Sequence, residues 1–320
     1  MTVKRFGASC VAMSEGTLAA IGSTPLIRLQ RLVPDGAAAV WVKMEAANPT
    51  GSYKDRMALA MIRGAERTGR LAPGQAVVEY TGGSTGSSLA FVCAVTGHPL
   101  HIVTSDAFAV EKRRTMEAFG ASVEIIESPA GITPELIPRM RARAGELAAE
   151  VEGFQTDQFR NTDMIDGYRQ LGVEIIEQMP NDVDAVCLYV GTAGCFLGVT
   201  RAMRETYPQL HRVAVEPAES AVLSGGAPGT HRIEGGGVGF VPDLLDHSDI
   251  DEVIAVSTAD ACDMARRAAR EEGLLSGPST GANIRAALVL AERLGAGRHV
   301  VTIQVDSGLK YLAGDLYDTP

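Results

Sequence analysis

The 320-residue sequence has few cysteines, and none of them stands in a metal-binding or redox motif. Its five cysteines are odd in number and far apart: Cys10, Cys93, Cys187, Cys195 and Cys262. The six histidines form no pair at the spacing i, i+4. This pattern argues against a zinc site and against a disulfide framework, and it predicts reduced thiols in a cytoplasmic protein.

Long hydrophobic runs and an excess of positive charge are also absent. No run of about 18 apolar residues occurs, so no membrane-spanning helix is expected, and the N-terminus lacks the apolar core of a secretory signal. The 29 Lys and Arg residues face 39 Asp and Glu, and this net charge of −10 argues against DNA or RNA binding. Aromatic residues make up 5% of the chain, but 46% of it is hydrophobic, which is ample for a packed core.

Short apolar runs alternate with segments of helical period along the chain. The run 185–190 has no strongly polar position, so both of its faces need cover, which is typical of a parallel sheet between helices. The alternation predicts an α/β fold with right-handed crossovers. Strands are predicted at 39–44, 75–80, 100–104, 122–126, 185–190, 212–215 and 299–305, and helices at 55–68, 85–95, 111–119, 135–151, 164–179, 197–206, 259–272 and 282–294.

These elements fall into two clusters, roughly 39–151 and 185–305, and the chain length suits about two domains. We interpret the polar and aromatic stretch 153–162 as the crossing between two lobes. The Gly-rich segment 223–244 favours neither helix nor strand, and a loop of that length is usually functional.

Four Gly-rich loops adjoin a strand or open a helix, where ligands bind in open α/β sheets. The first, 48–56, places Lys54 at the first turn of a helix, whose dipole favours the neutral amine of a nucleophile. A solvated lysine paired with Asp55 is the alternative. The second loop, 81–88, suits an anion such as a carboxylate, and equally a plain helix cap.

The third loop, 191–198, lets the backbone approach an anion closely. It lacks the Lys–Ser/Thr ending of a P-loop and the pattern of a dinucleotide site, so the phosphate of another cofactor remains as the candidate ligand. The fourth, 277–282, is by itself a helix cap. The GxSxG pattern of serine hydrolases occurs at 82–86 and 277–281, but such a match is common in loops rich in Gly and Ser.

Together these loops are more specific than any one of them. NPTGSYKDR (48–56), TGGSTG (81–86), GTAGCFLG (191–198), IEGGGVGF (233–240) and GPSTG (277–281) occur in the order of the cysteine synthase/cystathionine β-synthase family. The sequence resembles this group of fold-type-II pyridoxal-phosphate enzymes from about Ile21 to Tyr311, where further similarities such as Asp306-Ser307-Gly308 lie.

The resemblance implies an α/β fold of two doubly wound domains, similar to the tryptophan synthase β-subunit, with the cofactor in the cleft between them. A smaller, mobile domain at 47–159 would carry the substrate loop. The larger domain, 1–46 with 160–320, would carry the phosphate loop. A homodimer is implied as well. From the cysteine pattern, the charge and the short apolar runs we further expect a cytoplasmic protein that binds no metal, nucleic acid or membrane.

The resemblance also implies roles for single residues. Lys54 would hold pyridoxal 5′-phosphate as a Schiff base and later move protons at the substrate, and Ser279 would bind the pyridine nitrogen. The phosphate would lie on Gly191, Thr192, Ala193, Gly194 and Cys195, and Gly235 would line the open face of the cofactor. The substrate carboxylate would be bound by Thr81, Gly82, Gly83, Ser84, Thr85 and Gln158, and Ser84 would also lie at the 3′-oxygen of the cofactor.

The implied activity is β-replacement on an activated serine, such as O-acetylserine, through an aminoacrylate, with sulfide or another nucleophile. A hydroxyl such as that of Ser279 leaves the pyridine ring a moderate electron sink, which suits loss of a β-substituent. The alternative is a lyase that releases ammonia from serine, threonine or cysteine. Hypotheses of other classes are a nucleotide-binding oxidoreductase and a non-catalytic scaffold, and the intact Lys54 argues against the scaffold.

Four residues depart from the family pattern. Gly82 stands where the family has Ser, Ser84 where it has Asn, Ala193 where it has Gly, and Cys195 where it has Thr. A thiol is only a weak donor, so other groups should compensate at Cys195. These departures leave the cofactor assignment intact and leave the donor amino acid and the nucleophile open.

Overall fold

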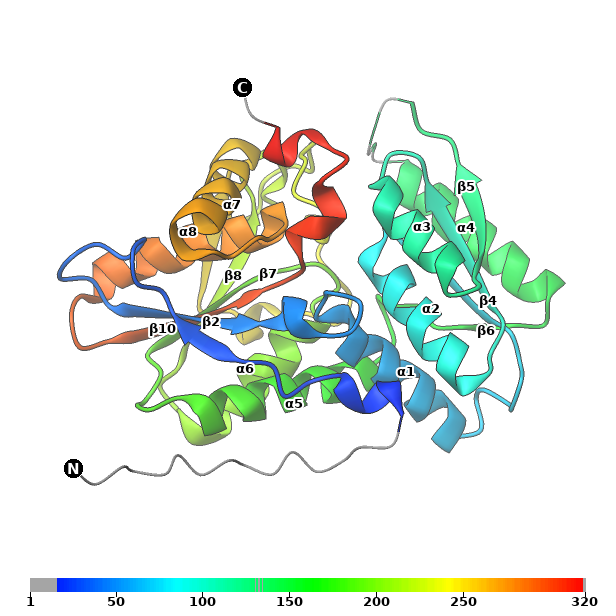
Figure 1. Cartoon of the computed structure of the whole chain (residues 1–320), viewed down its shortest axis with the longest axis horizontal. Coiled ribbons are helices and arrows are strands. Elements are labelled where there is room, and N and C mark those ends of the chain that lie inside the picture. Colours follow the sequence, from blue (N-terminus) through cyan, green and yellow to red (C-terminus); the bar gives the residue numbers. More distant parts are fainter. Residues whose placement is uncertain (1–15, 130, 132, 134, 319–320) are drawn as a thin grey trace, which may run out of the picture.

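The computed structural model describes residues 16–129, 131, 133 and 135–318. Within them the chain forms two α/β units side by side, each built on its own sheet (Figure 1). Cys10 and the N-terminal segment considered for a secretory signal lie outside the described residues. In the described part, Cys93, Cys187, Cys195 and Cys262 form no disulfide, and no helix there is long and apolar enough to cross a membrane.

The larger sheet has six strands in the order β1-β2-β10-β7-β8-β9. They are β1 (Leu26–Arg28), β2 (Ala39–Met44), β7 (Ala185–Tyr189), β8 (His211–Pro217), β9 (Glu252–Val256) and β10 (His299–Gln304). All neighbours pair in parallel except β1, which runs antiparallel to β2. Alternate residues of β7 enter two different cores: Val186 and Leu188 join one and Cys187 the other. The prediction of a strand covered on both faces is therefore confirmed.

Two helix pairs cover this sheet. Helices α5 (Asp163–Gln178) and α6 (Gly194–Thr206) pack against each other and share the core of Val186 and Leu188. Helices α7 (Thr258–Glu272) and α8 (Pro278–Leu294) lie on the face of Cys187.

The smaller sheet has four parallel strands in the order β5-β4-β3-β6. They are β3 (Val77–Tyr80), β4 (Leu100–Ser105), β5 (Ser122–Ile126) and β6 (Phe154–Gln155). Helix α4 (Leu136–Glu150) covers one face, and α2 (Ser84–Thr96) and α3 (Val110–Ala118) lie on the other side. Helix α1 (Lys54–Arg67) packs on both α2 and α5, so it joins the two units (Figure 1).

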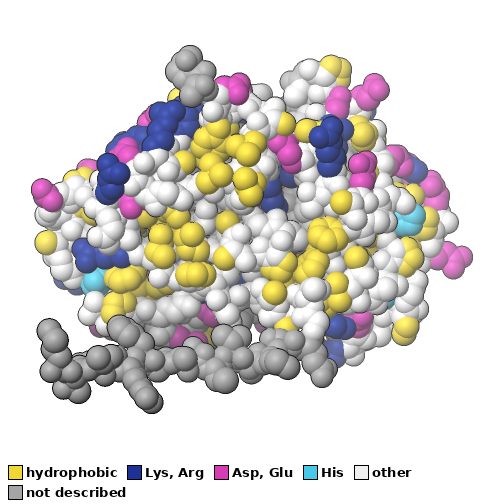
Figure 2. All heavy atoms as spheres, viewed as in Figure 1, with side chains coloured by type: hydrophobic (Ala, Val, Ile, Leu, Met, Phe, Trp, Pro, Cys, Tyr) yellow, Lys and Arg dark blue, Asp and Glu magenta, His cyan; other side chains and the backbone are white. Residues whose placement is uncertain are grey.

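Short 3-10 helices complete the described part of the chain: η1 (Thr17–Ala20), η2 (Glu45–Ala47), η3 (Ala218–Ser220), η4 (His247–Asp249), η5 (Gly308–Tyr311) and η6 (Asp315–Tyr317). On the face drawn in Figure 2, acidic and basic side chains are interspersed and hydrophobic side chains gather at several places. Charge of one sign does not dominate this face.

Every predicted strand and helix is present, but three strands were not predicted. Strand β1 has three residues and β6 only two, too few to show a period, and the sequence of β9 (EVIAV) was not recognised. Strand β6 lies in the stretch interpreted as a crossing, where it pairs with β3. Helices α6 and α8 begin at Gly194 and Pro278, three and four residues earlier than predicted, because their first turns are part of the Gly-rich loops. The domain limits at 47 and 159 stay a prediction.

Candidate active site

One cavity of about 900 Å³ lies where the carboxyl ends of β3 and β7 face each other across the two units. Three helices contribute a first residue or first turn to its wall, at Lys54 of α1, Ser84 of α2 and Ser279 of α8. The residues just before α6, Gly191 and Thr192, line it as well. Helix N-termini carry unpaired N–H groups and the positive end of the helix dipole, so their convergence favours an anionic ligand.

Lys54 is the first residue of α1, and only 5% of it is exposed. Its Nζ lies 4.6 Å from the centre of the Tyr53 ring. Burial lowers the pKa of this amine to about 8, although Asp306 and Glu79 act in the opposite direction. With this pKa, about a tenth of the amine is uncharged at pH 7 and about half at pH 8, and the uncharged form is the one a nucleophilic lysine needs.

A buried ion network fixes the start of α1. The guanidinium of Arg56 donates to Glu45 at 2.7 and 2.9 Å and to Glu174 at 2.7 and 2.8 Å. Lys43 on β2 adds a further bond to Glu174 at 2.8 Å. Because these contacts join η2, α1, α5 and β2, they hold the backbone of Lys54 against the larger unit.

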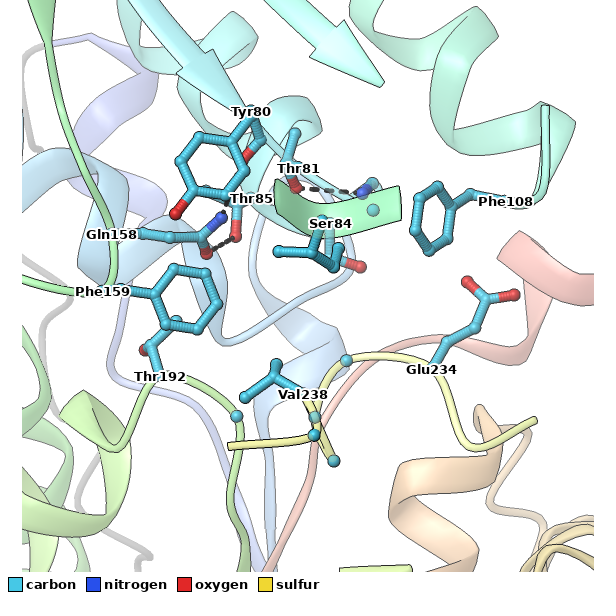
Figure 3. Close-up of a pocket in the computed structure, with 18 of the residues that line it drawn as sticks. Tyr80, Thr81, Ser84, Thr85, Phe108, Gln158, Phe159, Thr192, Glu234 and Val238 are labelled. Atoms are coloured by element: carbon cyan, nitrogen blue, oxygen red, sulfur yellow. Dashed lines mark hydrogen bonds between the residues drawn. The ribbon is translucent and has the colours of Figure 1, made fainter. Parts of the chain in front are cut away.

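The substrate loop predicted at residues 81–85 is ordered by its own hydroxyl groups (Figure 3). Thr81 Oγ1 accepts from the N–H of Gly83 at 3.0 Å, and Thr85 Oγ1 donates to Gln158 Oε1 at 2.8 Å. Gln158 Nε2 donates to the Tyr80 carbonyl at 3.0 Å. The structure thus brings Gln158 to the loop, more than 70 residues away in sequence.

The two glycines of this loop allow close approach of α3 and the turn before it. A Cβ built on Gly82 would lie 2.7 Å from Cε1 of Phe108, so the phenyl ring occupies the place where the family has the Ser side chain. Gly83 has a φ of 142°, and a side chain there would overlap the stem of Lys112. Both neighbours line the cavity.

The predicted phosphate loop divides between two cavities. Gly191 and Thr192 line the large cavity, and they also line a small adjoining one of about 10 Å³ together with Ala193 and Cys195. Gly194 lines neither, and it packs on Met164. Ala193 has a φ of 69°, a left-handed conformation that costs a non-glycine residue about 1–2 kcal/mol.

The glycine loop that carries Gly235 lies against the end of β7. The N–H of Gly237 donates to the Val190 carbonyl at 3.2 Å, and a side chain on Gly191 would overlap the carbonyl of Gly235. Gly235 and its neighbours up to Gly239 line the large cavity.

Three buried polar atoms of residues in the cavity wall have no hydrogen-bond partner among the described residues: Asp157 Oδ1, Ser279 Oγ and Asp306 Oδ1. Ser279 lies in the first turn of α8 and only 1% of it is exposed. A buried unpaired hydroxyl costs about 1–3 kcal/mol. Ser279 is therefore a group that a ligand in the cavity would satisfy.

A polar network that the sequence did not predict closes the other side of the cavity. Lys112 Nζ donates to Glu234 Oε2 at 2.5 Å and to Tyr311 OH at 3.1 Å. Tyr311 OH donates to Asp306 Oδ2 at 2.8 Å, and Ser84 Oγ donates to the same oxygen at 3.3 Å.

These bonds join α3 and the substrate loop to the larger unit. Asp306 and Glu234 stand in motifs that the sequence singled out. Lys112, within the charged run EKRR, carries no such signal.

The sequence of this chain is similar to those of known proteins. A family model described as "Pyridoxal-phosphate dependent enzyme" matches residues 17–306. The cysteine synthase of Staphylococcus aureus (strain Mu50 / ATCC 700699) is 41% identical over 299 residues, which cover 93% of this chain and 95% of that protein.

Two solved structures share the fold. The cysteine synthase of Entamoeba histolytica superposes with a TM-score of 0.91 at 33% identity, over 100% of this chain and 95% of that one. An O-ureido-L-serine synthase gives a TM-score of 0.89 at 35% identity, over 96% of each chain.

Proposed function

This chain belongs to the family of pyridoxal-phosphate-dependent enzymes, and we propose that it replaces the β-substituent of an O-acylated serine by a nucleophile such as sulfide. Relatives named cysteine synthase and O-ureido-L-serine synthase support this type of reaction. The observation that carries the proposal is the meeting of Lys54, the loop 81–85 and Ser279 around one cavity.

The residues of the cavity fit the cofactor. Ser279 Oγ is an unpaired buried hydroxyl that suits the pyridine nitrogen. The N–H groups that open α6, next to Thr192 and Ala193, suit the phosphate. Lys54 has an amine of lowered pKa for a covalent bond to the aldehyde. When bound, pyridoxal phosphate supplies an electron-withdrawing ring that acidifies the α-hydrogen of an amino acid.

The chain's own side chains would then orient the substrate and move its protons. The hydroxyls and N–H groups of residues 81–85 would bind the α-carboxylate, and Gln158, held by Thr85 and Tyr80, would fix one side of that subsite. Lys54 Nζ would take the proton from the α-carbon and return it before the product leaves. The network of Lys112 with Glu234 would keep the two units together over the substrate and limit access of water.

The charges of the cavity favour a donor whose β-substituent is uncharged while it is bound, such as an acetyl ester, over a phosphate ester. Besides Lys54, the cations among the described lining residues are Lys112, Arg141 and Arg160. Lys112 is paired with Glu234, Arg160 with Asp243, and Arg141 is exposed. A phosphoserine donor would bring a dianion into a cavity whose buried cation, Lys112, is already paired and whose Arg141 is exposed to solvent, so the cost of its desolvation is only partly offset.

The test compares O-acetyl-L-serine with O-phospho-L-serine, using the cofactor-loaded protein, sulfide as nucleophile and the Lys54→Ala variant as control. We expect cysteine formation with a kcat/KM at least about tenfold higher for the acetyl donor, a difference of about 1.4 kcal/mol in the transition state. Preference for the phosphate donor would overturn the donor assignment. Pyruvate as the only product, with or without sulfide, would identify a lyase instead.

The assembly follows from the resemblance alone, and the location from the pattern of the cysteines. We propose a cytoplasmic homodimer, for which light scattering should give twice the chain mass of 33.7 kDa. A mass of one chain would contradict it.

A further inference from the structure

Glu79 is a buried carboxyl group directly behind the substrate loop. It lies in β3 two residues before Thr81, and none of it is exposed. All three of its hydrogen-bond donors are neutral. Oε2 accepts from Thr156 Oγ1 at 2.6 Å and from the N–H of Gln158 at 3.0 Å, and Oε1 accepts from the N–H of Tyr80 at 2.9 Å.

A carboxyl in such a place is costly for the fold. Burial of an ionised group without a cation beside it lowers stability, and an apolar residue would fill a sheet interior at less cost. The role of Glu79 is therefore to be found in the segments that its hydrogen bonds reach. Two of the three reach the turn that follows β6 and carries Gln158.

The turn at residues 156–158 needs hydrogen bonds from residues outside it. Its central residue, Asp157, has a φ of 44°, in the left-handed region that disfavours any residue with a side chain. Glu79 binds the residue on each side of it, Thr156 and Gln158. The side chain of Gln158 in turn contacts Thr85 Oγ1 at 2.8 Å and the Tyr80 carbonyl at 3.0 Å.

We infer that Glu79 is a positioning residue for the substrate carboxylate, and that its ionised form holds Gln158 more firmly than its protonated form in the geometry that binds this group. The inference rests on the proposed function, since it assigns a support to the same subsite. Ionised Glu79 offers acceptor oxygens only, which matches three donors. A proton on the carboxyl removes the charge that strengthens these bonds, so the two bonds to the turn become weaker.

The groups that face Glu79 set the pH at which this change occurs. Burial raises the pKa of Glu79 to about 7, against its hydrogen bonds, and the neighbouring Asp157 acts in the same direction as burial. Tyr80, which also adjoins Glu79, is a neutral phenol, because burial and the charges of Glu79 and Asp157 all raise the pKa of its hydroxyl. Lys54 is the cation whose pKa Glu79 affects. Protonation of Glu79 therefore falls between pH 6 and 8.

The test measures binding rather than turnover. L-Methionine, which has no leaving group at Cβ, is titrated into the cofactor-loaded protein from pH 6 to 9, and its dissociation constant is read from cofactor absorbance and from the shift in melting temperature. The amino group of the free ligand titrates identically for every variant, so a difference between variants reports on the protein.

In the wild type we expect a pH-dependent contribution to the dissociation constant, called here the pH component, that weakens L-methionine binding about five- to tenfold from pH 8 to pH 6. Glu79→Gln, which cannot ionise, is expected to lose this component. Glu79→Leu, which removes the acceptor, is expected to bind about five- to thirtyfold more weakly at pH 8, the effect of one or two hydrogen bonds.

Glu216→Gln is the matched control. Glu216 is another buried carboxyl at the end of a strand, and it accepts from the N–H of Leu223 at 2.7 Å and from Ser224 Oγ at 2.6 Å, far along the chain from the substrate loop. This variant should keep the wild-type pH component.

An unchanged pH component in Glu79→Gln, or unchanged binding in Glu79→Leu, would overturn the inference. If Glu79→Leu does not fold, the pH profile of Glu79→Gln still decides. Absence of both L-methionine binding and cysteine formation from O-acetyl-L-serine in the wild type would remove the proposed function itself.

Discussion

The contact between Gly82 and Phe108 gives a prediction about stability that can be worked from the structure. In Gly82→Ser, the added Cβ would lie 2.7 Å from Cε1 and 3.0 Å from Cζ of Phe108, a ring that is 9% exposed and packs under α4. The backbone of Gly82 is not in the left-handed region, so strain arises only from this overlap.

Overpacking of this kind costs about 1–3 kcal/mol. The serine should therefore lower the free energy of unfolding of the cofactor-loaded protein by about that amount, seen as a lower urea midpoint at unchanged slope. The double variant Gly82→Ser/Phe108→Ala should be more stable than the sum of the two single effects by at least about 1 kcal/mol, because removal of the ring frees the space.

Gly145→Ser is the control, since a Cβ on Gly145 meets nothing within 4 Å on the exposed side of α4. We expect a change within about 0.5 kcal/mol there. A Gly82→Ser protein as stable as the wild type, or a strictly additive double variant, would refute the argument that the Phe108 ring excludes the side chain.

Three further predictions concern the cofactor. Because the free amine of Lys54 must attack the aldehyde and its pKa is about 8, covalent uptake of pyridoxal phosphate by the apoprotein should speed up with rising pH and level off above about pH 8; a flat rate from pH 6 to 9, followed by absorbance, would contradict this. Ser279→Asp should change the cofactor spectrum and slow β-replacement, since a carboxylate favours a protonated ring nitrogen; an unaltered spectrum and rate would remove Ser279 from the site. Cys195→Thr should slow cofactor release about two- to tenfold, measured after dilution, because a hydroxyl donates a stronger hydrogen bond than a thiol; faster release would show that Cys195 does not face the phosphate.

The sequence was sufficient for the elements whose signal is local. The uninterrupted apolar run at 185–190 indicated a strand covered on both faces, and β7 is such a strand, with Val186 and Cys187 in different cores. The loops of Gly and Ser residues between strands and helices likewise contribute residues to the wall of the large cavity. Their composition reflects the needs of helix N-termini, which are properties of a few neighbouring residues.

Elements without a local signal appeared only in the structure. Strand β6 has two residues and exists because β3 offers it a pairing edge. The early starts of α6 and α8 were missed because the sequence pattern of a Gly-rich loop does not show where its last residues become helical.

By itself the sequence determined the helices, seven of the strands, the family resemblance and Lys54 as the candidate nucleophile, because apolar periodicity and short motifs are written in adjacent residues. Only the tertiary structure decided which residues contact each other across the site. Phe108 packs against Gly82, Lys112 binds Glu234, and Glu79 binds the turn that carries Gln158. The partners of the last two pairs stand 122 and 79 residues apart. Such contacts depend on how two sheets are placed relative to each other, and no pattern within either segment encodes that placement.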